Sequence, residues 1–164
     1  MREVRRRTNP HRLPALGALP GWLTRIYAAR GIDDPAALDL HLDRLHPPAA
    51  MRDLDVAARR LADALSAGEA ILIVSDYDAD GATGTALMLL ALRAMGCSSV
   101  DFLVPNRFDY GYGLSPEIVE LAATLDPALI VTVDNGIASI AGVEAAARHG
   151  IEVLITDHHL PGAR

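Results

Sequence analysis

The sequence predicts an α/β fold in which a parallel sheet is flanked by helices, in a Rossmann-like arrangement. Two observations carry this prediction. Short runs rich in Val, Ile and Leu recur after residue 68, and segments with helical character lie between them. Continuous rather than alternating apolar runs are typical of parallel strands that are covered on both faces.

Four strands are expected from these apolar runs, namely Ala70–Ser75, Ser99–Val104, Leu129–Val133 and Val153–Thr156. The connecting segments predict helices over Thr83–Met95, Pro116–Leu125 and Ser139–His149. A strand, helix, strand order of this kind gives parallel neighbours, because each helix returns the chain to the starting edge of the sheet.

Residues 1–68 are predicted to form a helical leader before the α/β part, which covers residues 69–164. Three short helices are expected in the leader, over Pro20–Arg30, Pro35–Leu45 and Leu54–Ala67. Asp33 or Asp34 precedes a proline and suits a helix cap, and Gly68 suits a helix end.

Composition limits the kinds of protein that this chain can be. It has 164 residues, of which 51% are hydrophobic, enough for a packed core, and its net charge of −6 argues against a general polyanion binder. No apolar stretch approaches the roughly 20 residues that span a bilayer. With a single cysteine and no signal-peptide pattern, we expect a soluble, cytoplasmic protein with no membrane partner.

Acidic residues follow three of the predicted strands. Asp76, Asp78 and Asp80 come after the first, Asp134 after the third, and the triplet 157–159, Asp-His-His, after the fourth. Carboxylates crowded together repel one another unless a cation offsets their charge. Because the carboxyl ends of parallel strands meet at one edge of the sheet, the sequence predicts a metal site there.

Two other interpretations of the first cluster are weaker. An EF-hand calcium loop would need a Glu at its twelfth position, where this chain has Leu87, and a helix rather than a strand before it. An aspartyl-phosphate phosphatase also uses paired Asp residues at a strand end, but it requires a downstream Lys or Arg and this chain contains no Lys.

The paired histidines favour a borderline divalent ion over an all-oxygen calcium site. Together with the acidic motifs they resemble the DHH phosphoesterase superfamily and, within it, the RecJ-type single-strand-specific exonucleases. The motifs that carry this resemblance are SDYDADGATGTA from Ser75, VPNRFDYGYGLS from Val104, VTVDNGI from Val131 and TDHHLP from Thr156.

This resemblance implies a site for two divalent metal ions, Mn²⁺ or Mg²⁺. Asp78 and Asp80 would each bind one ion, Asp134 would bridge the two, and His158 would complete the second site. A catalytic role is implied for His159, which would contact the scissile phosphate or assist a metal, and for Asp76 and Asp157, which would orient the ligands. The residues expected to contact substrate are Arg107, Tyr112, Gly81, Thr83 and Asn135.

The resemblance also implies an activity, namely 5′–3′ exonuclease hydrolysis of single-stranded DNA in recombination and repair. A repair helicase or a single-strand-binding protein would be a partner. Two alternatives stay open: a DHH phosphodiesterase for short oligonucleotides or cyclic dinucleotides, and a non-catalytic DHH scaffold. The chain ends shortly after His159, so we expect the amino-terminal part of an incomplete DHH domain that lacks a last metal ligand and has little activity alone.

Overall fold

The computed structural model describes residues 12–162 and contains a four-stranded parallel sheet. The strands are β1 (Ile71–Ser75), β2 (Val100–Leu103), β3 (Leu129–Val133) and β4 (Glu152–Thr156), and their order in the sheet is β2-β1-β3-β4. The predicted fold class and all four strands are confirmed, and the bounds of β3 agree with the prediction at both ends.

The two central strands form the core of the sheet. Every residue of β1 and of β3 is buried, whereas the edge strands β2 and β4 are largely exposed or half-buried. Pairing in register places Ser75 beside Val133, and Val133 beside Thr156. The residues that follow these three strand ends therefore begin at the same edge of the sheet.

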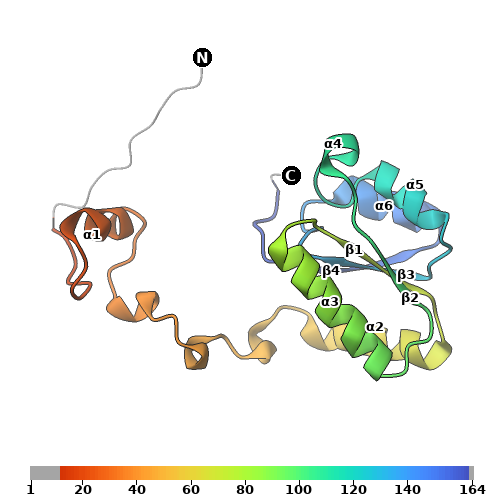
Figure 1. The fold of residues 1–164 in the computed structure, drawn as a ribbon, viewed down its shortest axis with the longest axis horizontal. Coiled ribbons are helices and arrows are strands. Elements are labelled where there is room, and N and C mark those ends of the chain that lie inside the picture. Colours follow the sequence, from red (N-terminus) through yellow and green to blue (C-terminus); the bar gives the residue numbers. More distant parts are fainter. Residues whose placement is uncertain (1–11, 163–164) are drawn as a thin grey trace, which may run out of the picture. The chain divides into compact units, whose positions relative to one another are not determined.

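Helices cover both faces of the sheet (Figure 1). On one face α5 (Pro116–Ala123) and α6 (Ile140–Arg148) pack against alternate residues of the central strands, including Leu72 and Ile130. On the other face α2 (Leu54–Ala67) and α3 (Ala79–Ala94) pack against the intervening residues, including Ile73. This alternation gives two apolar layers, because successive side chains of a strand point to opposite faces.

Two helical features differ from the prediction. Helix α3 begins at Ala79 rather than Thr83, because the Asp78 side chain caps it by accepting a hydrogen bond from the Gly81 amide. A short helix that the sequence did not predict, α4 (Arg107–Tyr110), follows β2 and is capped by Asn106. Both caps lie next to the motif residues, so these turns set the positions of the candidate site.

By their internal contacts the residues form two compact units, Met1–Arg52 and Asp53–Arg164, so that α2 belongs to the same unit as the sheet. The physical reason is that α2 packs Ala57, Leu61 and Leu65 onto the sheet. The expected end of α2 at Gly68 is confirmed, since this residue is the C-cap in the left-handed conformation.

The first unit contains one regular helix among its described residues, α1 (Gly21–Ala28). The predicted helix over Pro35–Leu45 is wrong: 3-10 turns occupy Pro35–Leu38 and Leu42–Arg44, and an extended Asp39 separates them. Asp34 caps the first turn, as the sequence allowed. Within residues 12–162, no helix has both the length and the apolar character needed to cross a membrane.

Candidate metal centre

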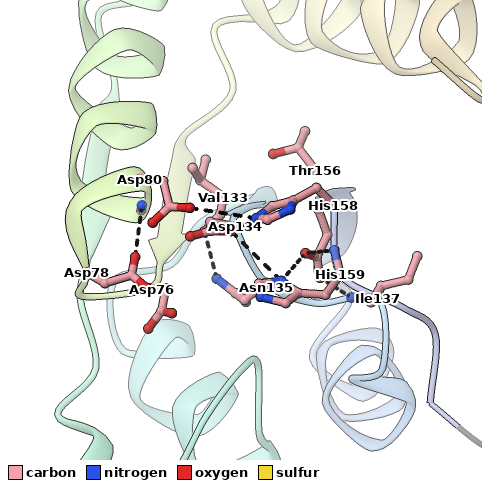
Figure 2. A network of polar contacts seen from close by, with 12 residues as sticks. Asp76, Asp78, Asp80, Val133, Asp134, Asn135, Ile137, Thr156, His158 and His159 are labelled. Atoms are coloured by element: carbon pink, nitrogen blue, oxygen red, sulfur yellow. Dashed lines mark hydrogen bonds and ion pairs between the residues drawn. The ribbon is translucent and has the colours of Figure 1, made fainter. Parts of the chain in front are cut away.

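The carboxyl ends of β1, β3 and β4 bring the acidic and histidine motifs together, as Figure 2 shows. Asp80 and Asp134 both approach the His158 ring, whose Nε2 lies 3.7 Å from Asp80 Oδ2 and 2.9 Å from Asp134 Oδ1. These residues are far apart in sequence, and the parallel topology alone makes them neighbours.

Asp134 is the buried centre of this cluster. Its backbone adopts a left-handed conformation with φ 62°, and its amide donates to the Thr156 carbonyl at 3.0 Å, which turns the side chain back over the sheet edge. Only 8% of the residue is exposed. Burial, and then the nearby charges of Asp80 and Asp78, raise the pKa of Asp134.

Neither carboxylate oxygen of Asp134 accepts a hydrogen bond of good geometry from the described residues. His158 Nε2 is within ion-pair distance of one oxygen, yet it does not satisfy hydrogen-bond geometry. A buried carboxylate without donors costs free energy, and a bound cation would offset this cost.

Asp157 holds the second histidine in place. Its Oδ1 lies 2.7 Å from His159 Nδ1, while its Oδ2 accepts a 2.9 Å hydrogen bond from the Ile137 amide. Burial opposes ionisation of Asp157, but the hydrogen bonds from the His159 and Ile137 amides and the His159 ring outweigh it and lower its pKa. The contact with Asp157 in turn raises the pKa of His159.

Tyr112 connects the loop after α4 to this centre. Its hydroxyl donates to the Asp134 carbonyl at 3.0 Å and lies 3.1 Å from His159 Nδ1. Burial and neighbouring carboxylates raise the pKa of Tyr112 to about 12. The hydroxyl therefore keeps its proton at neutral pH, and it tethers the loop to the end of β3.

Asp76 has a different partner. The Arg107 guanidinium binds both of its carboxylate oxygens, with Nε 3.1 Å from Oδ1 and Nη2 against Oδ2. Arg107 also lies over the Tyr77 ring at 4.4 Å and the Tyr112 ring at 5.1 Å. Tyr77 was missed in the sequence, although its place beside the first Asp of the motif was a usable signal.

Two groups of potential ligand atoms meet in this centre, and within each group the atoms lie within 4.8 Å of one another. One contains Asp76, Asp78 and Asp134, and the other contains Asp134, His158 and His159. Because the groups share Asp134 and combine carboxylate with imidazole donors, the residues present fit a pair of borderline divalent ions.

The other residues that the sequence associated with substrate have local structural contacts. The Gly81 amide donates to Asp78, and an added Cβ at Gly81 would lie 2.4 Å from the Asp76 carbonyl oxygen. Thr83 Oγ1 donates to the Ala79 carbonyl of its own helix at 2.8 Å. Asn135 is 1% exposed, and its amide group donates to the Val74 and Val133 carbonyls. A substrate contact by these three residues stays a prediction.

Comparison with known proteins places this fold and site in a defined class. Residues 70–164 match the DHH family, N-terminal domain. The chain belongs to this family, and both groups of potential metal ligands lie entirely within the matched residues.

Within the family, the similarity is to RecJ proteins. The chain is 48% identical over 160 residues to the single-stranded-DNA-specific exonuclease RecJ of Escherichia coli K12, covering 98% of this chain and 28% of that protein. The chain therefore spans little more than a quarter of the length of this curated relative.

Solved RecJ structures share the fold. A crystal structure of exonuclease RecJ bound to manganese matches with a TM-score of 0.66 and 38% identity, covering 73% of this chain and 31% of that one. The Mn²⁺ complex of RecJ from Thermus thermophilus matches with a TM-score of 0.61 and 35% identity over 84% of this chain and 19% of that one.

Proposed function

We propose that this chain carries the metal centre of a RecJ-type exonuclease, which hydrolyses phosphodiester bonds of single-stranded DNA from the 5′ end. The observation that carries the proposal is the pair of ligand groups that share Asp134, whose buried oxygens accept no hydrogen bond of good geometry from the described residues. The manganese-bound RecJ structures support it, since they resemble this chain in fold and at more than a third of the aligned residues.

Asp78, Asp80, Asp134 and His158 are the residues that we propose as ligands for two ions, Mn²⁺ or Mg²⁺. When bound, such ions act as Lewis acids that lower the pKa of a water and stabilise negative charge on a phosphodiester. Asp78 and Asp80 are exposed and stand at the start of α3, so they can adjust to an ion, whereas Asp134 is fixed by the backbone that follows β3.

The remaining residues orient and contact the substrate in this proposal. Asp157 holds Nδ1 of His159, which directs Nε2 of the ring to a phosphate oxygen. Arg107 supplies a planar cation for a phosphate, and Tyr112 offers a half-exposed ring for a base. Stacking tolerates any base, which suits an enzyme that selects single strands rather than sequences.

For the whole protein, we propose a role in the cytoplasm in recombination and repair, next to a helicase or a single-strand-binding protein. We assign to residues 69–164 the first part of the DHH domain, which the family match to residues 70–164 supports, and we propose a low hydrolytic rate for the chain alone. The DNA-specific names of the curated relatives are the support for this setting.

Two measurements test the proposed function. Calorimetric titration of the chain with MnCl₂ should show binding that is lost in Asp134→Asn and kept in Asp63→Asn, an exposed acid on α2. A version extended to the length of the E. coli relative should then release the label of 5′-labelled oligo(dT) as a mononucleotide, and progressively shorten 3′-labelled oligo(dT), in Mn²⁺. Preferential cleavage of dinucleotides would favour the small-substrate phosphodiesterases, and absence of Mn²⁺ binding would contradict the proposal.

A further inference from the structure

Two aspartates follow the central strands and are equally buried, but their partners differ. Asp76 follows β1 and is 6% exposed, and Asp134 follows β3 and is 8% exposed. Each belongs to a group of potential metal ligands. Judged by proximity alone, both aspartates would be metal ligands. Their hydrogen-bond partners, however, give them different roles.

The oxygens of Asp76 already have donors. Oδ1 accepts from the Tyr77 amide at 2.8 Å and from Arg107 Nε at 3.1 Å, and Oδ2 accepts from Arg107 Nη2. Asp134, in contrast, has no donor of good geometry on either oxygen among the described residues. A metal ion at Asp76 would have to displace a two-point contact with a charged donor inside a buried site, which is costly.

Arg107 is held on more than one side. Asp76 binds one edge of its guanidinium, and the Tyr77 and Tyr112 rings lie within 4.4 and 5.1 Å of its central carbon. The side chain nevertheless stays 36% exposed. Because the carboxylate takes Nε and Nη2, the Nη1 edge of the guanidinium keeps its donors available.

We infer that Asp76 is a positioning residue for Arg107 and does not ligate metal. The carboxylate fixes the guanidinium against the Tyr77 and Tyr112 rings, with Nη2 3.9 Å from Asp78 Oδ2, where its free edge meets a phosphate of a strand that enters the metal centre. This inference rests on the proposed function. In it Asp76 contributes to binding of the DNA backbone indirectly, by positioning Arg107. The positive charge of Arg107 also offsets part of the surplus negative charge beside the metal.

The inference is tested on the whole chain with Asp76→Asn, Arg107→Gln and the double variant. Mn²⁺ binding is measured by calorimetry, and the affinity for a fluorescein-labelled oligo(dT) of about 12 nucleotides by anisotropy in Mn²⁺. Circular dichroism checks that each variant folds. If Asp76→Asn does not fold, Arg107→Gln still tests the contact, because Arg107 is the more exposed of the two partners.

Asp76→Asn should keep the stoichiometry of Mn²⁺ and change its affinity by less than about threefold, since no ligand is lost. Affinity for oligo(dT) should fall about tenfold, by the same factor as in Arg107→Gln, because a charge-assisted contact positions the phosphate donor. The double variant should be no weaker than either single variant, as for two residues that act as one unit. Arg107→Lys should bind oligo(dT) as weakly as Arg107→Gln, because an ammonium group cannot make the two-point contact of a guanidinium with a carboxylate.

Loss of one Mn²⁺, or a fall in Mn²⁺ affinity as large as in Asp134→Asn, would make Asp76 a ligand and overturn the inference. Unchanged oligo(dT) affinity in Asp76→Asn would overturn it as well. Failure of the proposed function is distinct, because in that case the unaltered chain itself binds neither Mn²⁺ nor oligo(dT).

Discussion

The two ends of the sheet both carry charged clusters, but only one of them is balanced. At the amino end, Arg60 of α2 binds Glu69 just before β1 and Glu152 at the start of β4. Its Nη2 lies 2.7 Å from Glu69 Oε2. The hydrogen bond to Glu69, and then the one to Glu152, raise the pKa of Arg60, although burial of the guanidinium acts to lower it. Arg60 and Glu69 are partly buried and Glu152 is largely exposed, and their pairing connects α2 to the turn before β1 and to β4.

At the carboxyl end, acids outnumber the groups that offset them. Among the described residues, five aspartates and two histidines gather there with one arginine; the aspartates are Asp76, Asp78, Asp80, Asp134 and Asp157. Asp76 is satisfied by Arg107, while the buried Asp134 keeps a raised pKa and no good donor among the described residues.

The difference separates a stabilising cluster from a functional one. Paired charges at the amino end hold α2 and β4 together, whereas the unbalanced charges at the carboxyl end cost stability that a cation restores. Substitutions at the two ends should therefore change different quantities, and the following variants are ordered by the expected size of the effect.

Asp134→Asn should have the largest effect. Loss of the shared carboxylate should weaken Mn²⁺ binding by more than about 100-fold, while the metal-free chain becomes more stable because a buried like charge is removed. Asn also suits the left-handed backbone at this position. Calorimetry and thermal unfolding with and without Mn²⁺ measure the two effects, and a less stable metal-free variant would contradict the role assigned to charge repulsion.

Gly81→Ala should lower the free energy of unfolding by about 2 kcal/mol, because the new methyl meets the Asp76 carbonyl carbon and oxygen and forces α3 away from β1. The same shift moves Asp78 and Asp80 away from Asp134, so Mn²⁺ affinity should fall as well. Gly68→Ala is the control: its added Cβ meets no atom within 4 Å, and the expected cost is the backbone strain of about 1 kcal/mol. Denaturant unfolding compares the two variants, and an equal loss of stability in both would contradict the steric explanation.

Arg60→Gln should destabilise the chain by about 1 to 2 kcal/mol, since two glutamates lose their partly buried partner. Its Mn²⁺ affinity should stay unchanged. Arg59→Gln is a matched control on the same helix, because Arg59 Nε donates to the Asp55 carbonyl in an exposed contact within α2. A change in Mn²⁺ affinity in Arg60→Gln would show that the two ends of the sheet are coupled.

Tyr112→Phe should have the smallest effect. It removes the hydrogen bond to the Asp134 carbonyl but keeps the ring over Arg107, so a loss of about 0.5 to 1 kcal/mol in stability is expected. Mn²⁺ affinity should change by less than about threefold, because no ligand is removed. Thermal unfolding and calorimetry test this, and a loss of Mn²⁺ binding would give the hydroxyl a larger role.

Local patterns were sufficient for the four strands of the α/β unit, but not for α4 or for the start of α3. The segment Leu129–Val133 identified β3 to the residue, because a strand buried on both faces is rich in Val and Ile rather than alternating between apolar and polar residues. The Pro35–Leu45 segment was misread, since its apolar residues have no sheet to pack against in the described unit and only 3-10 turns form. Tertiary packing, and not helix propensity, decides such short segments.

The sequence by itself determined the fold class and predicted the candidate site at the carboxyl ends of the strands. Strand ends and the acidic residues that follow them can be read locally, and a parallel sheet places these ends at one edge. Only the tertiary structure decided how the charges are shared. It joined Asp76 to Arg107, which stand 31 positions apart, and it left the oxygens of Asp134 without a hydrogen bond of good geometry from the described residues. Hydrogen-bond partners across the sheet depend on side-chain geometry in three dimensions, and one-dimensional spacing does not contain that information.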